Sequence, residues 1–242
     1  MLSMADNAQR QILQRFFKTG EGQYGEGDKF LGIKVPQTRA VVRMARHTLP
    51  DAEIEKLLLS PWHEVRLCGF LLIVEEMAAA RPHRKEPPSA HAQRRRQILD
   101  LYLRNARRAN NWDLVDLSCP YVVGEFLLSP DEQGQMPSTG ILDRLAKSDN
   151  LWEQRIAIVS TLALIRNGRA DDSFRIADAL LAHPHDLIHK AVGWALREVG
   201  KRDIEALRRY LDTRFDRLPR TSLRYAIERM PPDERRAWMS RK

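Results

Sequence analysis

The segment NNWDLVDLSCPYVVGEFLL, residues 110–128, decides the fold class of this chain. Its apolar residues recur at three- and four-residue spacing, so it predicts a mostly apolar helix over 113–128. At the start of this helix Trp112, Asp113 and Asp116 lie within five residues of one another, although the chain as a whole is strongly basic. The segment therefore predicts both a helical core and a special position on its surface.

The same helical spacing recurs along the whole chain, and no segment keeps the alternation of a half-buried strand. The predicted helices cover 7–18, 37–46, 51–59, 62–78, 94–106, 113–128, 138–147, 151–166, 173–182, 186–200, 203–212 and 219–229. Proline, glycine and asparagine separate them. The polar segment 81–97 is predicted to be an exposed loop that leads into a basic helix, rather than a domain linker. We expect one all-α domain over 1–242.

A degenerate repeat organises these helices. Four segments align around one basic residue near the start of a long helix: HEVRLCGFLL with Arg66, WEQRIAIVSTL with Arg155, LIHKAVGWAL with Lys190 and SLRYAIERM with Arg224. The spacing from Lys190 to Arg224 is 34 residues, the length of a helical hairpin. Stacked hairpins predict a HEAT-like α-solenoid with a concave basic groove. The missing unit is 110–128, and at the equivalent position it carries Asp116.

The charge, the apolar runs and the cysteines of the chain limit which kinds of protein it can be. Lys and Arg number 40 against 32 acidic residues, a net charge of +8, which suits a polyanion but also a generally basic soluble protein. No apolar run is long enough for a membrane span and no signal peptide is recognised, so a cytoplasmic protein is expected. Cys68 and Cys119 form no C-x-x-C motif and are expected to be buried free thiols.

Two helix faces combine tryptophan with charge. Trp112 and Asp116 are four residues apart and share a face; Lys190 and Trp194 repeat that spacing, followed by Arg197. Each has an alternative interpretation. The tryptophans could be core anchors, and Asp116 could form a structural salt bridge with Arg155 of the next repeat. Asp113 is interpreted as a helix-start residue.

Other motifs are weak. The G-x-G-x-x-G match at Gly20, Gly22 and Gly25 follows a predicted helix instead of a strand, so it indicates a flexible loop rather than a dinucleotide site. His185 and His189 have helical spacing but lack the acidic or cysteine neighbours of a metal site. We expect no metal and no organic cofactor.

Four segments together resemble the AlkD-type DNA alkylation repair DNA glycosylases, a family built from HEAT-like repeats. They are FLGIKVPQTR at 30–39, NWDLVDLSCPYVVGEFL at 111–127, SDNLWEQRIAI at 148–158 and KAVGWALREVGK at 190–201. The resemblance spans most of the chain. It implies a base excision repair enzyme that hydrolyses the N-glycosidic bond of cationic N3- or N7-alkylated purines in double-stranded DNA, acting as a monomer in the bacterial cytoplasm or nucleoid.

The resemblance also implies site residues. Asp116 corresponds to the catalytic aspartate, Trp112 and Trp194 to the DNA-contacting tryptophans, and Arg155 to the arginine beside the lesion. Further implied DNA contacts are Tyr24, Lys34, Arg39, Arg66, Lys190, Arg197 and Arg224. A lysine of some members falls on Ala163. The family is associated with capture of the DNA backbone in an open groove, without a deep base pocket.

The residue types fit this chemistry. Alkylation makes the purine cationic and weakens its bond to the sugar, so an ionised carboxylate near C1′ can stabilise the oxocarbenium-like sugar. Two other classes stay open: a non-catalytic relative that binds branched or damaged DNA, and a HEAT-repeat scaffold that binds proteins.

Overall fold

The computed structural model describes residues 1–241, and within this range it contains helices and no β-strand. The α-helices are α1 (Asn7–Phe16), α2 (Val35–Ala45), α3 (Asp51–Leu58), α4 (His63–Ala79), α5 (Ala92–Arg104), α6 (Trp112–Asp116), α7 (Gly140–Ala146), α8 (Leu151–Arg166), α9 (Asp171–Leu180), α10 (Asp186–Gly200), α11 (Ile204–Arg214), α12 (Arg220–Ala226) and α13 (Pro232–Ser240). Short 3₁₀ helices cover Leu2–Met4, Ala106–Arg108 and Phe215–Arg217. The predicted all-α class is confirmed.

Two compact units make up the chain, Met1–Met136 and Pro137–Lys242. Each has its own helical core and is described separately below. The single domain and the continuous basic groove expected from the sequence stay predictions.

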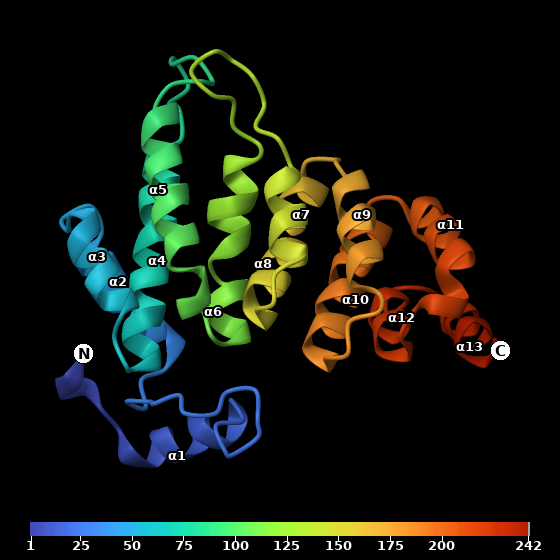
Figure 1. Ribbon diagram of the computed structural model, residues 1–242, viewed down its shortest axis with the longest axis horizontal. Coiled ribbons are helices and arrows are strands. Elements are labelled where there is room, and N and C mark those ends of the chain that lie inside the picture. The colour runs from blue at the N-terminus through green and yellow to red at the C-terminus, as the bar shows by residue number, and fades with distance from the viewer. Residues whose placement is uncertain (242) are drawn as a thin grey trace. The chain divides into compact units, whose positions relative to one another are not determined.

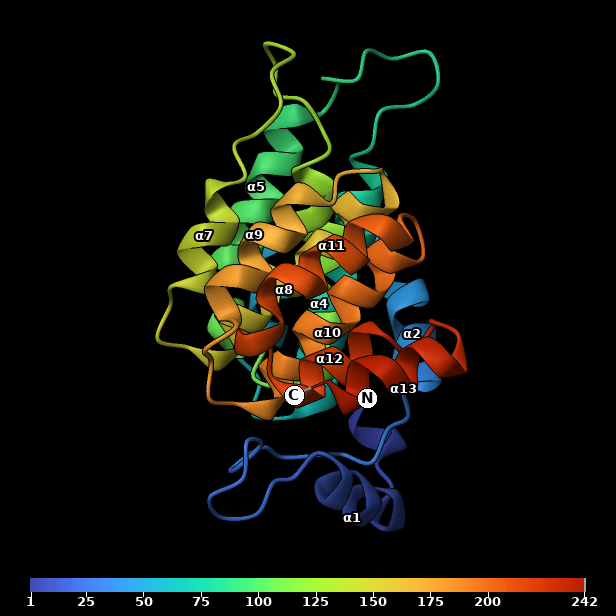
Figure 2. The same ribbon diagram turned by 90° about the vertical axis from the view of Figure 1, so that its right-hand side faces the viewer.

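In the first unit α4 is the central helix. It packs against α2, α3 and α5, and its buried face includes Phe70 and Ile73, both 0% exposed. Figures 1 and 2 show α1 at the end of this unit where α4 begins, and the loop between α4 and α5 at the opposite end. That loop covers 81–91, so most of the predicted exposed segment 81–97 is loop and the rest belongs to α5.

Helix α1 is fastened to the first unit through the segment that follows it. The backbone N–H of Asp6 donates to the carbonyl of Leu31 at 2.9 Å. Gly32 has a φ of +89°, and a Cβ there would lie 2.0 Å from the Asp6 carbonyl oxygen. Because only glycine permits this approach, the FLG sequence at 30–32 has a structural reason.

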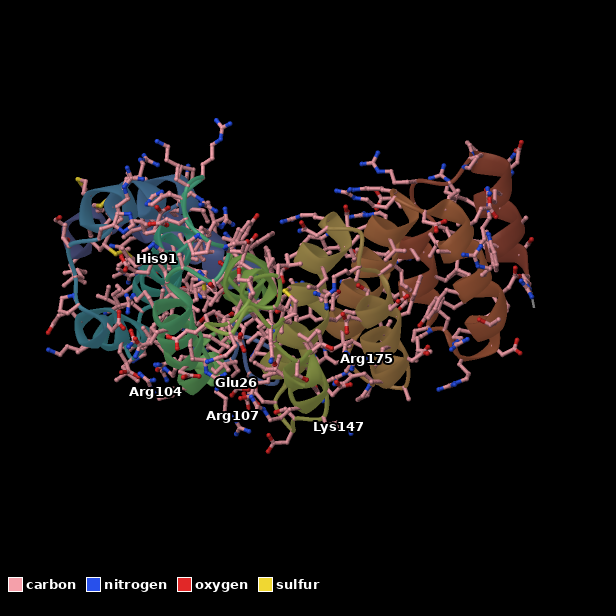
Figure 3. The ribbon with its side chains drawn as sticks, turned by 90° about the horizontal axis from the view of Figure 1, so that it is seen from above. Glu26, His91, Arg104, Arg107, Lys147 and Arg175 are labelled. Carbon is pink, nitrogen blue, oxygen red and sulfur yellow. The ribbon has the colours of Figure 1, made fainter. Side chains whose placement is uncertain are left out.

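The second unit is a stack of helical hairpins. α8, α10 and α12 pack in series, and α7, α9 and α11 contact them and form the other layer. At Gly193 a Cβ would lie 2.6 Å from the Ser222 carbonyl oxygen, so glycine lets α10 and α12 approach closely. On the other layer, Arg175 of α9, labelled in Figure 3, pairs with Asp143 of α7 and Asp172.

The main departure from the predicted helices concerns 113–128. The α-helix ends at Asp116, and a π-helical turn covers Pro120–Gly124. Proline has no backbone N–H, and its ring clashes with the carbonyl four residues earlier, which here belongs to Asp116. A continuous α-helix through Pro120 is therefore excluded. The sequence analysis also missed α13.

Candidate active site

A cavity of about 340 Å³ opens in the first unit between α1, α4 and α6. Trp112 and Asp116, the two residues of α6 predicted for the site, both line it. Lys34, the residue before α2, lines it as well and is exposed. The structure thus brings together three of the predicted site residues. The cavity itself differs from the expectation of an open groove without a pocket.

Most of the cavity wall is apolar and aromatic. Phe16, Phe17, Phe30 and Trp112 contribute their rings. The ring of Phe17 lies 5.3 Å from that of Trp112 and stacks on Phe30 at 5.2 Å, while Phe16 meets Trp112 edge-on at 5.8 Å. Trp112 is half-buried, so one part of its ring is anchored in this cluster and another part is accessible. The two interpretations of this tryptophan are therefore compatible.

A buried ionic network lies behind the cavity. Nδ1 of His63 donates to Oδ2 of Asp28 at 2.8 Å, and Nε2 donates to Oδ2 of Asp113 at 2.9 Å. Both ring nitrogens can donate only when the imidazole is protonated. Arg66 donates to the other oxygen of Asp28 at 2.5 Å, so two cations alternate with two carboxylates.

The protonation of these groups follows from their neighbours. Burial alone would lower the pKa of His63, but the charges and hydrogen bonds of Asp113 and Asp28 outweigh it and raise the pKa to about 9. Burial would raise the pKa of Asp28, but His63 and Arg66 bring it below its usual value. His63 and Asp28 are therefore both charged at neutral pH, and their opposite charges are adjacent.

Asp113 has a larger role than that of a helix-start residue. It does occupy the first turn of α6, where its Oδ1 accepts from the N–H of Leu114 at 2.9 Å. Its other oxygen belongs to the network through His63. Asn111, the residue before α6, accepts from the N–H of Trp112, so two side chains cap the start of this helix.

The position of Arg66 corrects the expectation of an exposed phosphate contact. Its side chain is 3% exposed, and its guanidinium donates to Asp28, to the carbonyl of Ser60 and to Asn110. The side chain of Arg66 is therefore buried inside the first unit, where its hydrogen-bond partners lie. Arg66 is the one residue of the aligned basic set that belongs to the first unit, and there it forms part of the buried ionic network.

Glu64 is a further buried charge beside the cavity. Its two carboxylate oxygens accept the backbone N–H groups of Leu31, Gly32 and Ile33 at 2.8 to 3.0 Å. These hydrogen bonds hold the FLGIK segment against the start of α4. Sequence reasoning missed Glu64 and the roles of His63 and Asp28 in the network, because the partners are 31 to 50 residues apart and form no local motif.

In the second unit the predicted residues lie on α8, α10 and α12. Arg155 is buried, and its Nη1 donates to the carbonyl of Leu187 at 2.6 Å. Lys190 pairs with Asp186 at 2.7 Å, and Arg197 pairs with Glu228. Arg224 is exposed and Trp194 half-buried. These residues share the layer of second helices, as the repeat predicts, but two of the cations already have carboxylate partners.

The remaining predicted positions fall as follows. Tyr24 is half-buried in the loop after α1, and Arg39 is exposed on α2. Ala163 is 2% exposed within α8, so its position belongs to the core of the second unit. The glycine-rich loop follows helix α1 and not a β-strand, so it lacks the strand–loop–helix arrangement of a dinucleotide site. Glycine is needed at Gly25 because a Cβ there would lie 2.4 Å from the carbonyl oxygen of Phe17.

Residues 1–241 also bear on the predictions about cysteines, membrane spans and metal sites. Cys68 and Cys119 are both buried and neither forms a disulfide bond, as predicted. Across these residues no helix has the length and apolar character needed to cross a membrane. Within the same range, no group of three or more His, Cys, Asp or Glu side chains is arranged to hold a metal ion.

Comparisons with known proteins identify the family. A predicted DNA alkylation repair enzyme from Enterococcus faecalis has a similar fold, with a TM-score of 0.66 and 15% sequence identity, over 94% of this chain and 97% of that one. No curated protein matches the sequence. The model of the family described as DNA alkylation repair enzyme matches residues 1–230. The chain therefore belongs to the DNA alkylation repair enzyme family.

Proposed function

We propose that this protein is a DNA glycosylase that removes cationic N3- or N7-alkylated purines from duplex DNA. The observation that carries the proposal is the shared position of Trp112 and Asp116, one helical turn apart on α6 and both at the wall of one cavity. A carboxylate and an aromatic ring side by side suit a reaction in which positive charge develops on a sugar.

In the proposed reaction the C1′–N bond breaks and its electron pair passes to the purine, which cancels the positive charge of the alkylated ring. The sugar becomes oxocarbenium-like, and Asp116 stabilises it electrostatically. Water then adds a hydroxyl group at C1′ and loses its remaining proton to solvent. Because the substrate base is already a good leaving group, the reaction needs no acid to protonate it.

We assign contacts with the DNA to both units. Trp112 of the first unit and Trp194 of the second are each proposed to contact DNA through cation–π and C–H contacts. Arg155, Lys190, Arg197 and Arg224 are the proposed cations of the second unit, with phosphates as their partners. Tyr24, Lys34 and Arg39 are proposed contacts of the first unit. Arg66 is left out, because its guanidinium serves the buried network.

The test is release of 7-methylguanine from methylated duplex DNA, with the wild type compared with Asp116→Asn. We expect the variant to lose at least about 100-fold in rate while it retains DNA binding, because a preorganised charge typically contributes this much. Asp100→Asn on α5 is the matched control, since Asp100 forms an exposed pair with Arg96 and should not affect the rate. Equal rates for wild type and Asp116→Asn would refute the assignment.

The same assay separates the alternatives. DNA binding without base release by the wild type would favour a non-catalytic member that binds damaged DNA. Binding that is weak and depends little on salt would favour a protein-interaction scaffold, because phosphate contacts give a steep salt dependence.

A further inference from the structure

The ionic network of the first unit also borders a second hollow, a polar pocket of about 320 Å³. The polar residues that line this pocket are Glu26, Asp28, Lys29, Arg66, Arg108 and Asn110. It shares no lining residue with the cavity beside Asp116, although the network reaches both: Asp28 and Arg66 line the polar pocket, whereas His63 and Asp113 line the cavity.

The lining of the polar pocket carries a positive charge that its carboxylates do not balance. Three cations accompany two carboxylates. Both oxygens of Asp28 are already occupied, because Oδ1 accepts from Arg66 and from the backbone N–H of Lys29, and Oδ2 accepts from His63. The side chains of Lys29 and Arg108 form no ion pair within residues 1–241. Two cations at the pocket are therefore available to an anion.

Arg108 is held in place without an acidic partner. Its Nε and Nη2 donate to the backbone carbonyls of residues 58–60 at 3.1 to 3.2 Å, whereas Nη1 has no acceptor within the described chain. Burial and the nearby charge of Arg66 lower the pKa of Arg108, and the charge of Asp28 offsets this only in part. An anion beside Arg108 would therefore be stabilised by a fixed guanidinium with a free donor.

Two other side chains add hydrogen-bond donors to the pocket. Asn110 accepts from Arg66 at 2.9 Å through Oδ1, which fixes the orientation of its amide and leaves Nδ2 as a donor. Lys29 is exposed and its ammonium carries three donor hydrogens. Glu26, labelled in Figure 3, is the opposing carboxylate, and its Oε2 accepts the N–H of Gly22 at 2.8 Å. Donors from separate segments suit a phosphate better than a carboxylate, because a phosphate offers more oxygens in more directions.

We propose that the polar pocket binds a phosphate group through Arg108, Lys29 and Asn110. This inference goes beyond the proposed glycosylase function and does not depend on it. Two sources supply the same chemistry, a phosphate of the DNA backbone and a free phosphorylated molecule. In both cases the bound anion lies beside Arg66 and so borders the network that holds α6.

The experiment measures binding of inorganic phosphate to the full-length protein by isothermal titration at pH 7.5 and constant ionic strength. Acetate is the comparison, because it is an anion with only two oxygens. We expect saturable phosphate binding with a Kd below about 10 mM, and at least about threefold tighter binding of phosphate than of acetate.

Variants of opposite sign locate the phosphate. Lys29→Gln should weaken phosphate binding by at least about threefold, and Glu26→Gln should strengthen it by about twofold or more, because one removes an attractive charge and the other a repulsive one. Lys85→Gln and Glu21→Gln change the net charge equally but lie outside the pocket lining, so both should bind as the wild type does. All four residues are exposed, so the fold should be retained, and circular dichroism checks this.

Three results would overturn the phosphate site: no saturable binding in this range, less than threefold preference over acetate, or equal binding by Lys29→Gln and Lys85→Gln. A salt series with a duplex oligonucleotide then identifies the source. A slope reduced by about 1 in Lys29→Gln, and unchanged in Lys85→Gln, assigns the pocket to the DNA backbone. Weaker phosphate binding with an unchanged slope assigns it to a free phosphorylated molecule. Neither measurement involves base release, so failure of the glycosylase proposal would leave this site in place.

Discussion

His63 donates a hydrogen bond of 2.9 Å from Nε2 to Oδ2 of Asp113, the residue between Trp112 and the rest of α6. Helix α6 has only five residues, too few to be stable through its own hydrogen bonds. Its position depends on tertiary contacts, and this buried ion pair is one of them. The orientation of Trp112 and Asp116 is therefore coupled to the network around His63.

The raised pKa of His63 predicts how stability depends on pH. The folded protein raises this pKa from 6.5 to about 9, so the associated stabilisation is complete below pH 6.5 and is lost as the pH rises through 9. Its size is on the order of 3 kcal/mol. In His63→Gln this contribution is absent. We expect the difference in free energy of unfolding between wild type and variant, measured with urea, to shrink from pH 6 to pH 10 by about this amount. A difference that stays constant over this range would contradict the assignment of a buried imidazolium.

Glu64 should be more important for stability than an ordinary surface carboxylate. It accepts three buried N–H groups, and a glutamine in its place would present an N–H donor to at least one of them. We expect Glu64→Gln to lower the free energy of unfolding by about 2–3 kcal/mol. Glu75→Gln is the control, since Glu75 forms a partly exposed pair with Arg46 at 3.6 Å and should change stability by less than about 0.5 kcal/mol. Equal effects in urea unfolding would show that the three hydrogen bonds contribute little.

The sequence could predict the fold class because helical periodicity is a local property. It also identified Trp112 and Asp116 as neighbours, since two residues four positions apart on a helix lie on the same face. The predicted helix ends were less accurate where a single residue interrupts a helix although the apolar spacing continues. Pro120 is the clearest case. The apolar spacing continues through it, but in an α-helix its ring would clash with the carbonyl of Asp116.

The buried network lay beyond local patterns. Asp28 is 35 residues from His63, and nothing near either residue marks them as partners. Arg66 shows the same limit from the other side. Its position in the repeat matched that of Lys190, whose side chain is partly exposed, but the guanidinium of Arg66 is buried against Asp28, because a buried guanidinium needs an ionised partner. Repeat register predicts where a residue lies on a helix, whereas its partners decide whether it faces solvent.

The close approach of α10 and α12 predicts the effect of substituting Gly193. An alanine Cβ there would lie 2.5 Å from Cβ of Tyr225 and 2.6 Å from the carbonyl oxygen of Ser222, so the helices must move apart. We expect Gly193→Ala to lower the free energy of unfolding by about 1–3 kcal/mol. Gly140→Ala is the control, because an added Cβ at the start of α7 meets only Ser138 Oγ at 3.3 Å. Its stability should be unchanged or slightly higher. A wild-type value for Gly193→Ala would mean that this helix pair tolerates a wider spacing.

The layer of second helices in the second unit predicts which arginine contributes to DNA affinity. Arg224 is exposed on α12, and Arg209 is exposed on α11 in the other layer. If phosphates bind the α8, α10 and α12 layer, Arg224→Gln should reduce the slope of log affinity against log salt concentration by about 1. The Arg209→Gln slope should equal that of the wild type, although both variants lose the same net charge. The measurement is fluorescence anisotropy with a duplex oligonucleotide over a salt series. Equal slopes for the two variants would show that the charge acts through the net charge of the protein, and would remove Arg224 from the proposed interface.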